Sequence, residues 1–285
     1  MNIQLIQDSY GKSAVRFGKI TRHADYHDFK EIHVNIQLEG DFKTVYTEGD
    51  NHDVLPTDTM KNTIFILAKE HPVDTLENFG TFLTQYFLDN NPQVAKVTVD
   101  LTQIRWERMT VRGQANPHTY IGGSNEKWAA HVAQDRQTTF IESSIREMRV
   151  LKTTNSAFEG YIVDKFTTLP PAADRILATE MEAIWRYTHI YGVDFQKTRE
   201  AVRENLLNTF ADHHSLSVQH SLYLMGEAVL KNVAEVAEMS FKMPNLHYIP
   251  VNLKPFGMEN HNDIFVASGD AFGFITGTLK REDVK

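Results

Sequence analysis

The chain has 285 residues, of which 29 are Lys or Arg and 37 are Asp or Glu, and it contains no cysteine. Without cysteine, the protein has no disulfide framework, thiolate nucleophile, Cys-ligated zinc or iron–sulfur cluster. The net charge of −8 disfavours general binding to nucleic acid or to an anionic membrane, so an anionic ligand would need a local basic site.

The first clear pattern is a period-two alternation of apolar and polar residues from Ile32 to Leu38. Such alternation predicts a strand with one buried face. Gly40-Asp41 then predicts a turn, and residues 42–47 are expected to return as the hairpin partner of that strand.

Two helices are expected next. Apolar residues at helical spacing over 60–67 predict the first, which Asp58 or Thr59 could cap and which His71-Pro72 would end. A second apolar stripe over residues 76–87 predicts the other helix.

Alternation returns over residues 97–109 and 131–141, which predicts two more strands. The first half therefore has the order of two strands, two helices and two strands. The second half repeats this order, with extended segments at 149–153 and 180–187, helices at 196–211 and 218–229, and strands at 237–241 and 264–267.

Two copies of this unit predict an α+β fold, in which antiparallel sheets carry helices on one face. The expected domains are residues 1–141 and 142–285. No linker rich in Pro, Gly or Ser separates them, so the two halves are expected to pack together.

Familiar cofactor motifs are absent from the sequence. It contains no Gly-x-Gly-x-x-Gly after a strand, no phosphate-binding loop and no Gly-x-Ser-x-Gly elbow. The nearest candidates for metal ligands are residues 212–214 and 261–263, but His213 and His214 are adjacent and would point to different faces of a helix. We therefore expect neither a metal nor an organic cofactor.

The sequence shows no recognisable targeting signal. Residues 1–10 lack the apolar run of a secretory signal, and no stretch approaches the roughly 20 apolar residues of a membrane helix. The final residues do not form the Ser-Lys-Leu peroxisomal address. The sequence therefore predicts a cytoplasmic protein that does not enter a membrane.

Five segments, in order along the chain, carry information beyond pattern. They are Tyr10-Gly11-Lys12, residues 57–63, residues 151–158 continuing to Asp174-Arg175, residues 217–219 and residues 244–248. Together they resemble the motifs of the urate oxidase (uricase) family. The resemblance implies tandem tunnelling-fold (T-fold) domains that assemble into a barrel-like homotetramer.

The resemblance implies a clamp for a planar purine. Arg175 and Gln219 would hold the purine edge, Arg through its two-pronged donor fork and Gln through its amide. Phe158 would stack on the purine face, and the backbone at Val218 and at Thr57-Asp58 would bind the remaining ring edges.

The resemblance also implies a proton relay of Lys12, Thr57 and His247, with Asn245 holding dioxygen and later water. A lysine is ordinarily protonated at neutral pH, so Lys12 would need to be desolvated or to lie near Arg175 to act as a base. Thr57 would then pass a proton between Lys12 and the substrate or a water.

The implied reaction converts urate, dioxygen and water to 5-hydroxyisourate and hydrogen peroxide without a cofactor, as in purine degradation. Urate is electron-rich, and its deprotonated form can reduce dioxygen, so the protein need not supply a redox group. In the family, Thr57 and Asp58 reach a site whose clamp belongs to the neighbouring subunit. The active sites are therefore expected at subunit interfaces.

Two alternatives remain open from sequence. A non-catalytic T-fold oligomer that binds purines or pterins would keep the clamp but would not need Lys12, Thr57 and His247 together. A pterin-processing enzyme would need zinc ligands in recognisable spacing.

Taken singly, Lys12 has the ordinary interpretation of a solvated lysine and Arg175 that of a surface residue on a short helix. The loops at 48–53 and 257–263 have no predicted role.

Overall fold

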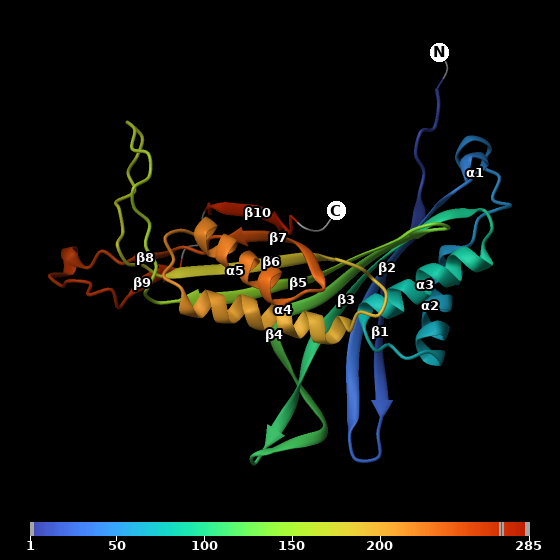
Figure 1. Ribbon diagram of the computed structural model, residues 1–285, viewed down its shortest axis with the longest axis horizontal. Helices are drawn as coiled ribbons and strands as arrows, with labels where there is room; N and C mark the ends of the chain where they lie inside the picture. The colour runs from blue at the N-terminus through green and yellow to red at the C-terminus, as the bar shows by residue number, and fades with distance from the viewer. Residues whose placement is uncertain (1–2, 268, 270, 283–285) are drawn as a thin grey trace. The chain divides into compact units, whose positions relative to one another are not determined.

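Two units, Met1–Ser144 and Ile145–Lys285, make up the chain in the computed structural model, which describes residues 3–267, 269 and 271–282 (Figure 1). The first unit contains β1 (Tyr10–Arg22), β2 (His27–Gly40), α1 (Lys43–Glu48), α2 (Thr57–Glu70), α3 (Leu76–Asn90), β3 (Val94–Val111) and β4 (Gln114–Asp135). Strand β5 (Thr139–Lys152) runs through the boundary. The second unit contains β6 (Leu177–Tyr187), α4 (Phe195–Asp212), α5 (Val218–Asn232), β7 (Val236–Pro244), β8 (Tyr248–Pro250), the short 3₁₀ helix η1 (Lys254–Phe256), β9 (Phe265–Ala267) and β10 (Phe274–Lys280).

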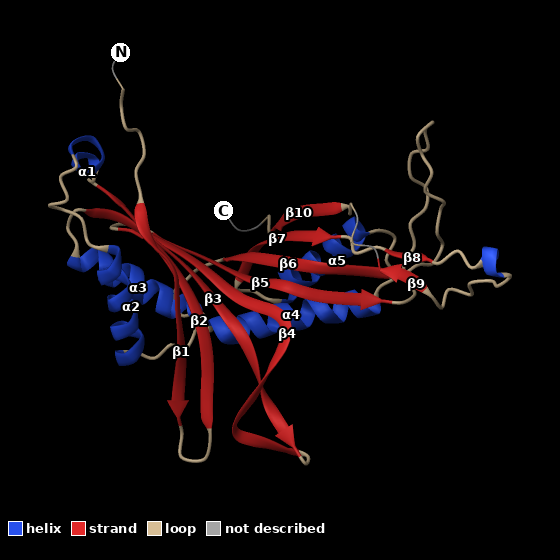
Figure 2. Ribbon diagram, turned by 180° about the vertical axis from the view of Figure 1, so that it is seen from behind, coloured by secondary structure: helices blue, strands red, loops and turns tan. Residues whose placement is uncertain are grey.

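In the first unit, strands β1 to β4 pair in sequence order, and each pair is antiparallel. Helix α2 packs against β1, and α3 packs against β3 and β4 (Figure 1). Both helices cover the same face of these strands (Figure 2). The predicted α+β architecture, with helices on one face of an antiparallel sheet, is confirmed.

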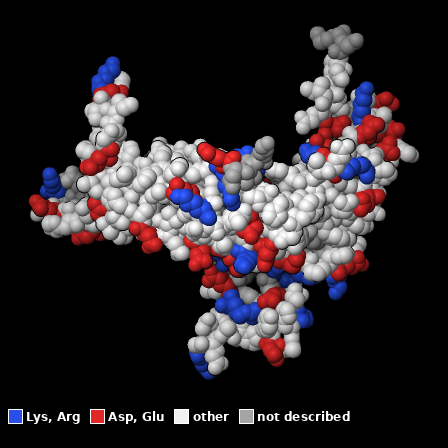
Figure 3. All heavy atoms as spheres, in the orientation of Figure 1, with Lys and Arg blue, Asp and Glu red and all other residues white. Residues whose placement is uncertain are grey.

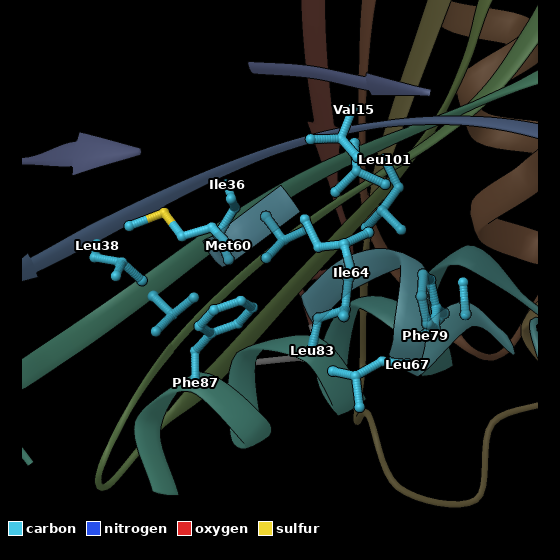
Figure 4. Close-up of a cluster of buried hydrophobic side chains, with 14 of the residues drawn as sticks. Val15, Ile36, Leu38, Met60, Ile64, Leu67, Phe79, Leu83, Phe87 and Leu101 are labelled. Carbon is cyan, nitrogen blue, oxygen red and sulfur yellow. The ribbon is translucent and has the colours of Figure 1, made fainter. Parts of the chain in front are cut away.

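The core of the first unit lies between this face and the two helices (Figure 4). Alternation along β2 places Ile36 and Leu38 in the core, where α2 contributes Met60 and Ile64. Each of these side chains is no more than 1% exposed. Burying one such side chain stabilises the fold by about 1.5–3 kcal/mol.

Helices α2 and α3 confirm the two helices predicted for this half. The residue before α2 is Pro56, and no side chain among the described residues caps this end, so the prediction that Asp58 or Thr59 would act as cap is wrong. Asp58 instead lies in the first turn. The helix ends as expected before Pro72, with His71 at its C-cap.

Residues 42–47 do not form the predicted hairpin strand. Residues 43–47 instead belong to the short helix α1, and Phe42, directly before it, is buried. The physical reason is that β2 is already paired on both edges, by β1 and by β3. The true hairpin partner of β2 is β1, which the sequence pattern did not reveal.

The single strand predicted over 131–141 is also wrong. Strand β4 ends at Asp135, whose Oδ1 accepts hydrogen bonds from the backbone N–H groups of Gln137 and Thr138, both at 2.7 Å. These bonds form a tight turn. Strand β5 then begins at Thr139.

In the second unit, β6, β7 and β10 are antiparallel neighbours, and α5 packs against β7 and β10 (Figure 2). Helices α4 and α5 confirm the two predicted helices. The strand predicted at 264–267 corresponds to β9, which pairs with β8 in a separate two-stranded sheet. The last strand of the main pairing is β10, which was not predicted.

Charged side chains of both signs are interspersed on the face shown in Figure 3. This mixture agrees with the modest excess of acidic residues in the sequence. Within the described part of the chain, no helix has the length and apolar character needed to cross a bilayer.

Candidate active site

The predicted site residues fall into two groups, one in each unit. Lys12, Thr57 and Asp58 belong to the first unit. Lys12 lies on β1 and pairs with Ile36 of β2, while Thr57 and Asp58 are the first two residues of α2. Lys12 and Thr57 are both half-buried.

The side chain of Asp58 is engaged within its own helix. Lys61 Nζ donates to Asp58 Oδ1 at 2.5 Å, and Asn62 Nδ2 donates to Oδ2 at 3.0 Å. The bond and charge of Lys61 lower the pKa of this exposed carboxyl, and the charge of Lys12 adds a smaller effect in the same direction. The charge of Lys12 therefore reaches the start of α2. The backbone N–H groups of the first helical turn have no partner within the helix and favour an anionic group.

In the second unit, the structure brings Phe158 and Arg175 together. The guanidinium carbon of Arg175 lies 5.1 Å from the ring centroid of Phe158, and the ring of Tyr161 is stacked on Phe158 at 4.9 Å. Arg175 is half-buried and lies in an irregular segment, so the interpretation as a surface residue on a helix is wrong.

Arg175 also carries an unused donor. Its Nε is buried and has no hydrogen-bond partner among the residues that the structure describes. Burial lowers the pKa of the guanidinium, but an arginine remains charged at neutral pH. A buried cation with an unused donor is suited to binding an anionic, hydrogen-bonding ligand.

Short backbone hydrogen bonds hold this pair in place. The N–H of Phe158 donates to the carbonyl of Ala172 at 2.8 Å, and the N–H of Arg175 donates to the carbonyl of Ser156 at 2.7 Å. Asp174 Oδ1 accepts from the N–H of Ser156 at 3.2 Å. The segment before Phe158 and the segment that ends at Arg175 are thus fastened to each other.

Val218 and Gln219 begin helix α5. Ser217 is its N-cap, and the Ser217 hydroxyl accepts from the N–H of His220 at 3.1 Å. Val218 is buried, whereas Gln219 is exposed. The start of α5 is joined to the Phe158 segment through Ser215, whose carbonyl accepts from the N–H of Ala157 at 2.7 Å.

Asn245 and His247 follow the end of β7, and both are half-buried. Asn245 forms an isolated bridge with Thr179 near the start of β6, and its N–H donates to the carbonyl of Gly273 at 2.7 Å. Since Thr179 follows Arg175 closely in the chain, Asn245 is anchored to the strand that begins just after the arginine.

Two supporting groups were given no role from sequence. Asp174 fastens the loop at Ser156, and His213 bonds to Ser221 of α5, with Nε2 lying 2.8 Å from the hydroxyl oxygen. An acidic residue directly before Arg175 was a usable signal for the first. The contact of His213 with Ser221 depends on the turn between α4 and α5, and no sequence pattern predicted that turn.

No three His, Asp or Glu side chains within the described residues are grouped so that they could hold a metal ion. His213 lies against Thr209 and Ser221, and His214 bonds to Asn155. These two histidines are therefore used in local structure.

Comparisons with known proteins identify the same family over nearly the whole chain. The uricase family model matches residues 8–139 and 141–276. A uricase from Oryctolagus cuniculus is 35% identical over 287 residues, covering 99% of this chain and 96% of its own, and one from Arthrobacter globiformis is 36% identical over 280 residues, covering 98% and 91%.

Solved structures give the same result for the fold. The crystal structure of the Arthrobacter globiformis uricase superposes with a TM-score of 0.94 at 36% identity and covers 100% of this chain and 97% of its own. A Bacillus fastidious uricase superposes with a TM-score of 0.83 at 23% identity, covering 97% and 94%.

Proposed function

Because this chain belongs to the uricase family, we propose that it oxidises urate with dioxygen and water to 5-hydroxyisourate and hydrogen peroxide, without a metal or organic cofactor. As a member of that family it is an oxidoreductase that acts on urate. The observation that carries the proposal is the buried Nε of Arg175, which has no hydrogen-bond partner within the described part of the chain and belongs to the guanidinium beside the ring of Phe158.

Phe158 and Arg175 form the centre of the substrate clamp. A purine stacks with its aromatic face on the Phe158 ring. Its edge then meets the guanidinium, which donates hydrogen bonds to a urate oxygen and a ring nitrogen. Gln219 binds the opposite edge through its amide.

Two helix N-termini complete the binding of the anion. Val218 begins α5 and Thr57 begins α2. The free N–H groups in the first turn of a helix favour a negative charge placed there, by about 0.3–1 kcal/mol for each helix. Because the Asp58 carboxylate is held by Lys61 and Asn62, its backbone rather than its side chain faces the ligand.

Lys12, Thr57 and His247 move the protons. Lys12 takes a proton from urate through the hydroxyl of Thr57, and the urate dianion transfers two electrons to dioxygen. Dioxygen takes up two protons, one returned from Lys12 and one from solvent, to give hydrogen peroxide, and the oxidised ring then adds water. Asn245 holds dioxygen first and then the water whose oxygen is added to the ring.

The two groups of residues meet between copies of the chain in a homotetramer. Lys12 and Thr57 from one copy face the clamp of Phe158 and Arg175 from another. In support, the loop closed by the bridge between Phe158 and Ala172 exposes apolar side chains that a partner subunit would bury. These are Ile162 at 92%, Val163 at 74%, Phe166 at 78% and Leu169 at 55% exposed.

A non-catalytic purine or pterin binder is not favoured by the family assignment. The decisive experiment follows urate absorbance, oxygen uptake and peroxide together, using protein treated with a chelator and checked for flavin. We expect one peroxide for each urate consumed. Turnover without oxygen, or activity lost after chelator treatment, would contradict the proposal.

A further inference from the structure

Strand β1 is irregular directly beside Lys12. Its register against β2 shifts between Lys12 and Val15, where residues 13–14 together oppose the single residue Asn35. Two residues against one are the defining feature of a β-bulge. The bulge therefore lies on the residues that immediately follow the proposed base.

The bulge decides which face of the sheet Lys12 occupies. Side chains alternate along a regular strand, so residues three apart point to opposite faces. Val15 is buried in the core at 3% exposure, and an unbulged β1 would turn Lys12 away from that core. Because residues 13–14 count as one position, Lys12 shares the face of Val15, which α2 covers.

Two observations agree with this placement. Tyr10, two residues before Lys12 and so on its face, packs on the core with its ring 4.8 Å from that of Phe42. The charge of Lys12 also reaches Asp58 at the start of α2. The bulge therefore places Lys12 on the side of β1 against which α2 packs, and Thr57 is the first residue of α2.

Asn35 holds the bulge closed. Ala14 has φ of 57°, a left-handed conformation that disfavours an L residue with a side chain. Its N–H, which the bulge removes from the ladder, donates instead to Asn35 Oδ1 at 2.8 Å. On the other side of Lys12, a Cβ on Gly11 would lie 1.8 Å from the Ile36 carbonyl oxygen, so β1 approaches β2 too closely there for a residue with a side chain.

We propose that Asn35 is a positioning residue for urate oxidation, because its side chain holds the bulge that turns Lys12 toward Thr57. The proposal rests on the proposed role of Lys12 as base. Asn35 itself touches no reacting atom, and its effect is expected on proton transfer rather than on substrate binding, since the clamp residues lie in the other unit.

The test compares four variants. Asn35→Ala removes the acceptor, whereas Asn35→Asp keeps an oxygen at the same place. Asn35→Ala combined with Ala14→Gly restores the bulge by another route, because glycine adopts positive φ without strain. Gln37→Ala is the matched control, an exposed amide on the same face of β2.

We expect Asn35→Ala to lower kcat by about twofold to tenfold, the range of one lost hydrogen bond, with a smaller change in KM. Asn35→Asp and the double variant should recover most of the rate, and Gln37→Ala should match the unaltered protein. Amide exchange read by mass spectrometry on the peptide spanning residues 10–17 should rise in Asn35→Ala alone.

Full kcat and unchanged amide exchange in Asn35→Ala would overturn the inference, as would equal damage from Gln37→Ala. Lys12→Met assayed in parallel separates the two proposals. If Lys12→Met is slow and Asn35→Ala is not, only the positioning role fails. If Lys12→Met keeps its rate, the proposed base fails, and amide exchange still decides whether Asn35 holds the bulge.

Discussion

Arg175 lies over the ring of Phe158, with its guanidinium carbon 5.1 Å from the ring centroid. Both residues are anchored through backbone hydrogen bonds of 2.7–2.8 Å, Arg175 to Ser156 and Phe158 to Ala172. The pair is therefore formed before any ligand arrives. A pre-organised cation beside an aromatic face favours a planar anion, because little ordering remains to be done on binding.

Arg175→Lys tests this clamp. Lysine keeps the charge but not the planar donor fork, so KM for urate should rise about tenfold to a hundredfold, the range of a charge-assisted hydrogen bond. Steady-state kinetics measure it. Arg149→Lys is the control, since Arg149 is exposed and bonds to Glu180. An unchanged KM in Arg175→Lys would remove the guanidinium from the clamp.

The proton relay makes a different prediction. Lys12→Met and Thr57→Ala should lower kcat by about a hundredfold or more, as expected when a positioned base is lost. Binding of xanthine, a related purine that serves as the probe here, should weaken far less. Lys43→Met, a change at the exposed first residue of α1, provides the control. Equal losses in kcat and xanthine affinity would place Lys12 in binding instead.

The elements with regular periodicity could be predicted from sequence, and the irregular ones could not. Helix α2 and strand β2 each have one buried face and an unbroken pattern, and both were found. Strand β1 was missed because the bulge at residues 13–14 interrupts the alternation. Strand β10 was missed where Gly277 replaces an apolar residue, and there Leu222 of α5 fills the space, 2.9 Å from where a Cβ on Gly277 would lie.

The candidate site shows the same limit. The residues of the clamp and relay were assigned through their resemblance to a family, since no periodicity marks Arg175 or Asn245. The structure adds the contact of Arg175 with Phe158 and the anchoring of Asn245 to Thr179. The contact of Asn245 joins it to Thr179, far away in the sequence, and the contact of Arg175 with Phe158 forms across an irregular loop. Periodicity within one helix or strand carries no information about either contact.

Core packing gives a stability prediction. Leu83 of α3 is 0% exposed in the first-unit core, so Leu83→Ala should lower the free energy of unfolding by about 2–5 kcal/mol. Tyr86→Ala on the same helix removes a side chain that is 36% exposed and should change stability much less. Urea denaturation at one fixed protein concentration measures both, because assembly adds to stability. Equal losses would contradict the assignment of the core.

His213 predicts a loss of stability in mild acid. Burial lowers its pKa, and Lys152, His220 and His214 act in the same direction, while the bond to the Thr209 carbonyl opposes them. In the unfolded chain this histidine has a pKa of about 6.5 and therefore binds the proton more readily than in the folded chain. The stabilisation is present above that value and is lost as pH falls through the folded pKa.

Unfolding midpoints in urea between about pH 7 and pH 5 measure this effect. His213→Gln should flatten the decline, because the titrating group is gone. His214→Gln, at the exposed neighbouring position, should flatten the decline far less, because the charge of His214 is the smallest of the causes that lower the pKa of His213. An identical slope in His213→Gln and the unaltered protein would show that other groups cause the decline.

Sharing of the active site between copies makes the last prediction. Lys12→Met and Arg175→Ala should each be nearly inactive alone, since each removes one half of every site. If the halves come from different copies, mixed oligomers contain some sites that pair the intact Lys12 of one variant with the intact Arg175 of the other. Random assembly of equal amounts gives about a quarter of the sites in this form.

Co-expression of the two variants with different affinity tags, followed by purification through both tags, isolates the mixed oligomers. We expect activity to return to roughly a quarter of that of the unaltered protein at equal subunit content. Mixing the two purified variants without subunit exchange is the control and should restore nothing. If the doubly tagged oligomers stay inactive while light scattering shows them assembled, each site is built within one chain. The exposed apolar side chains near Phe166 would then serve assembly alone, without bringing Lys12 to the clamp.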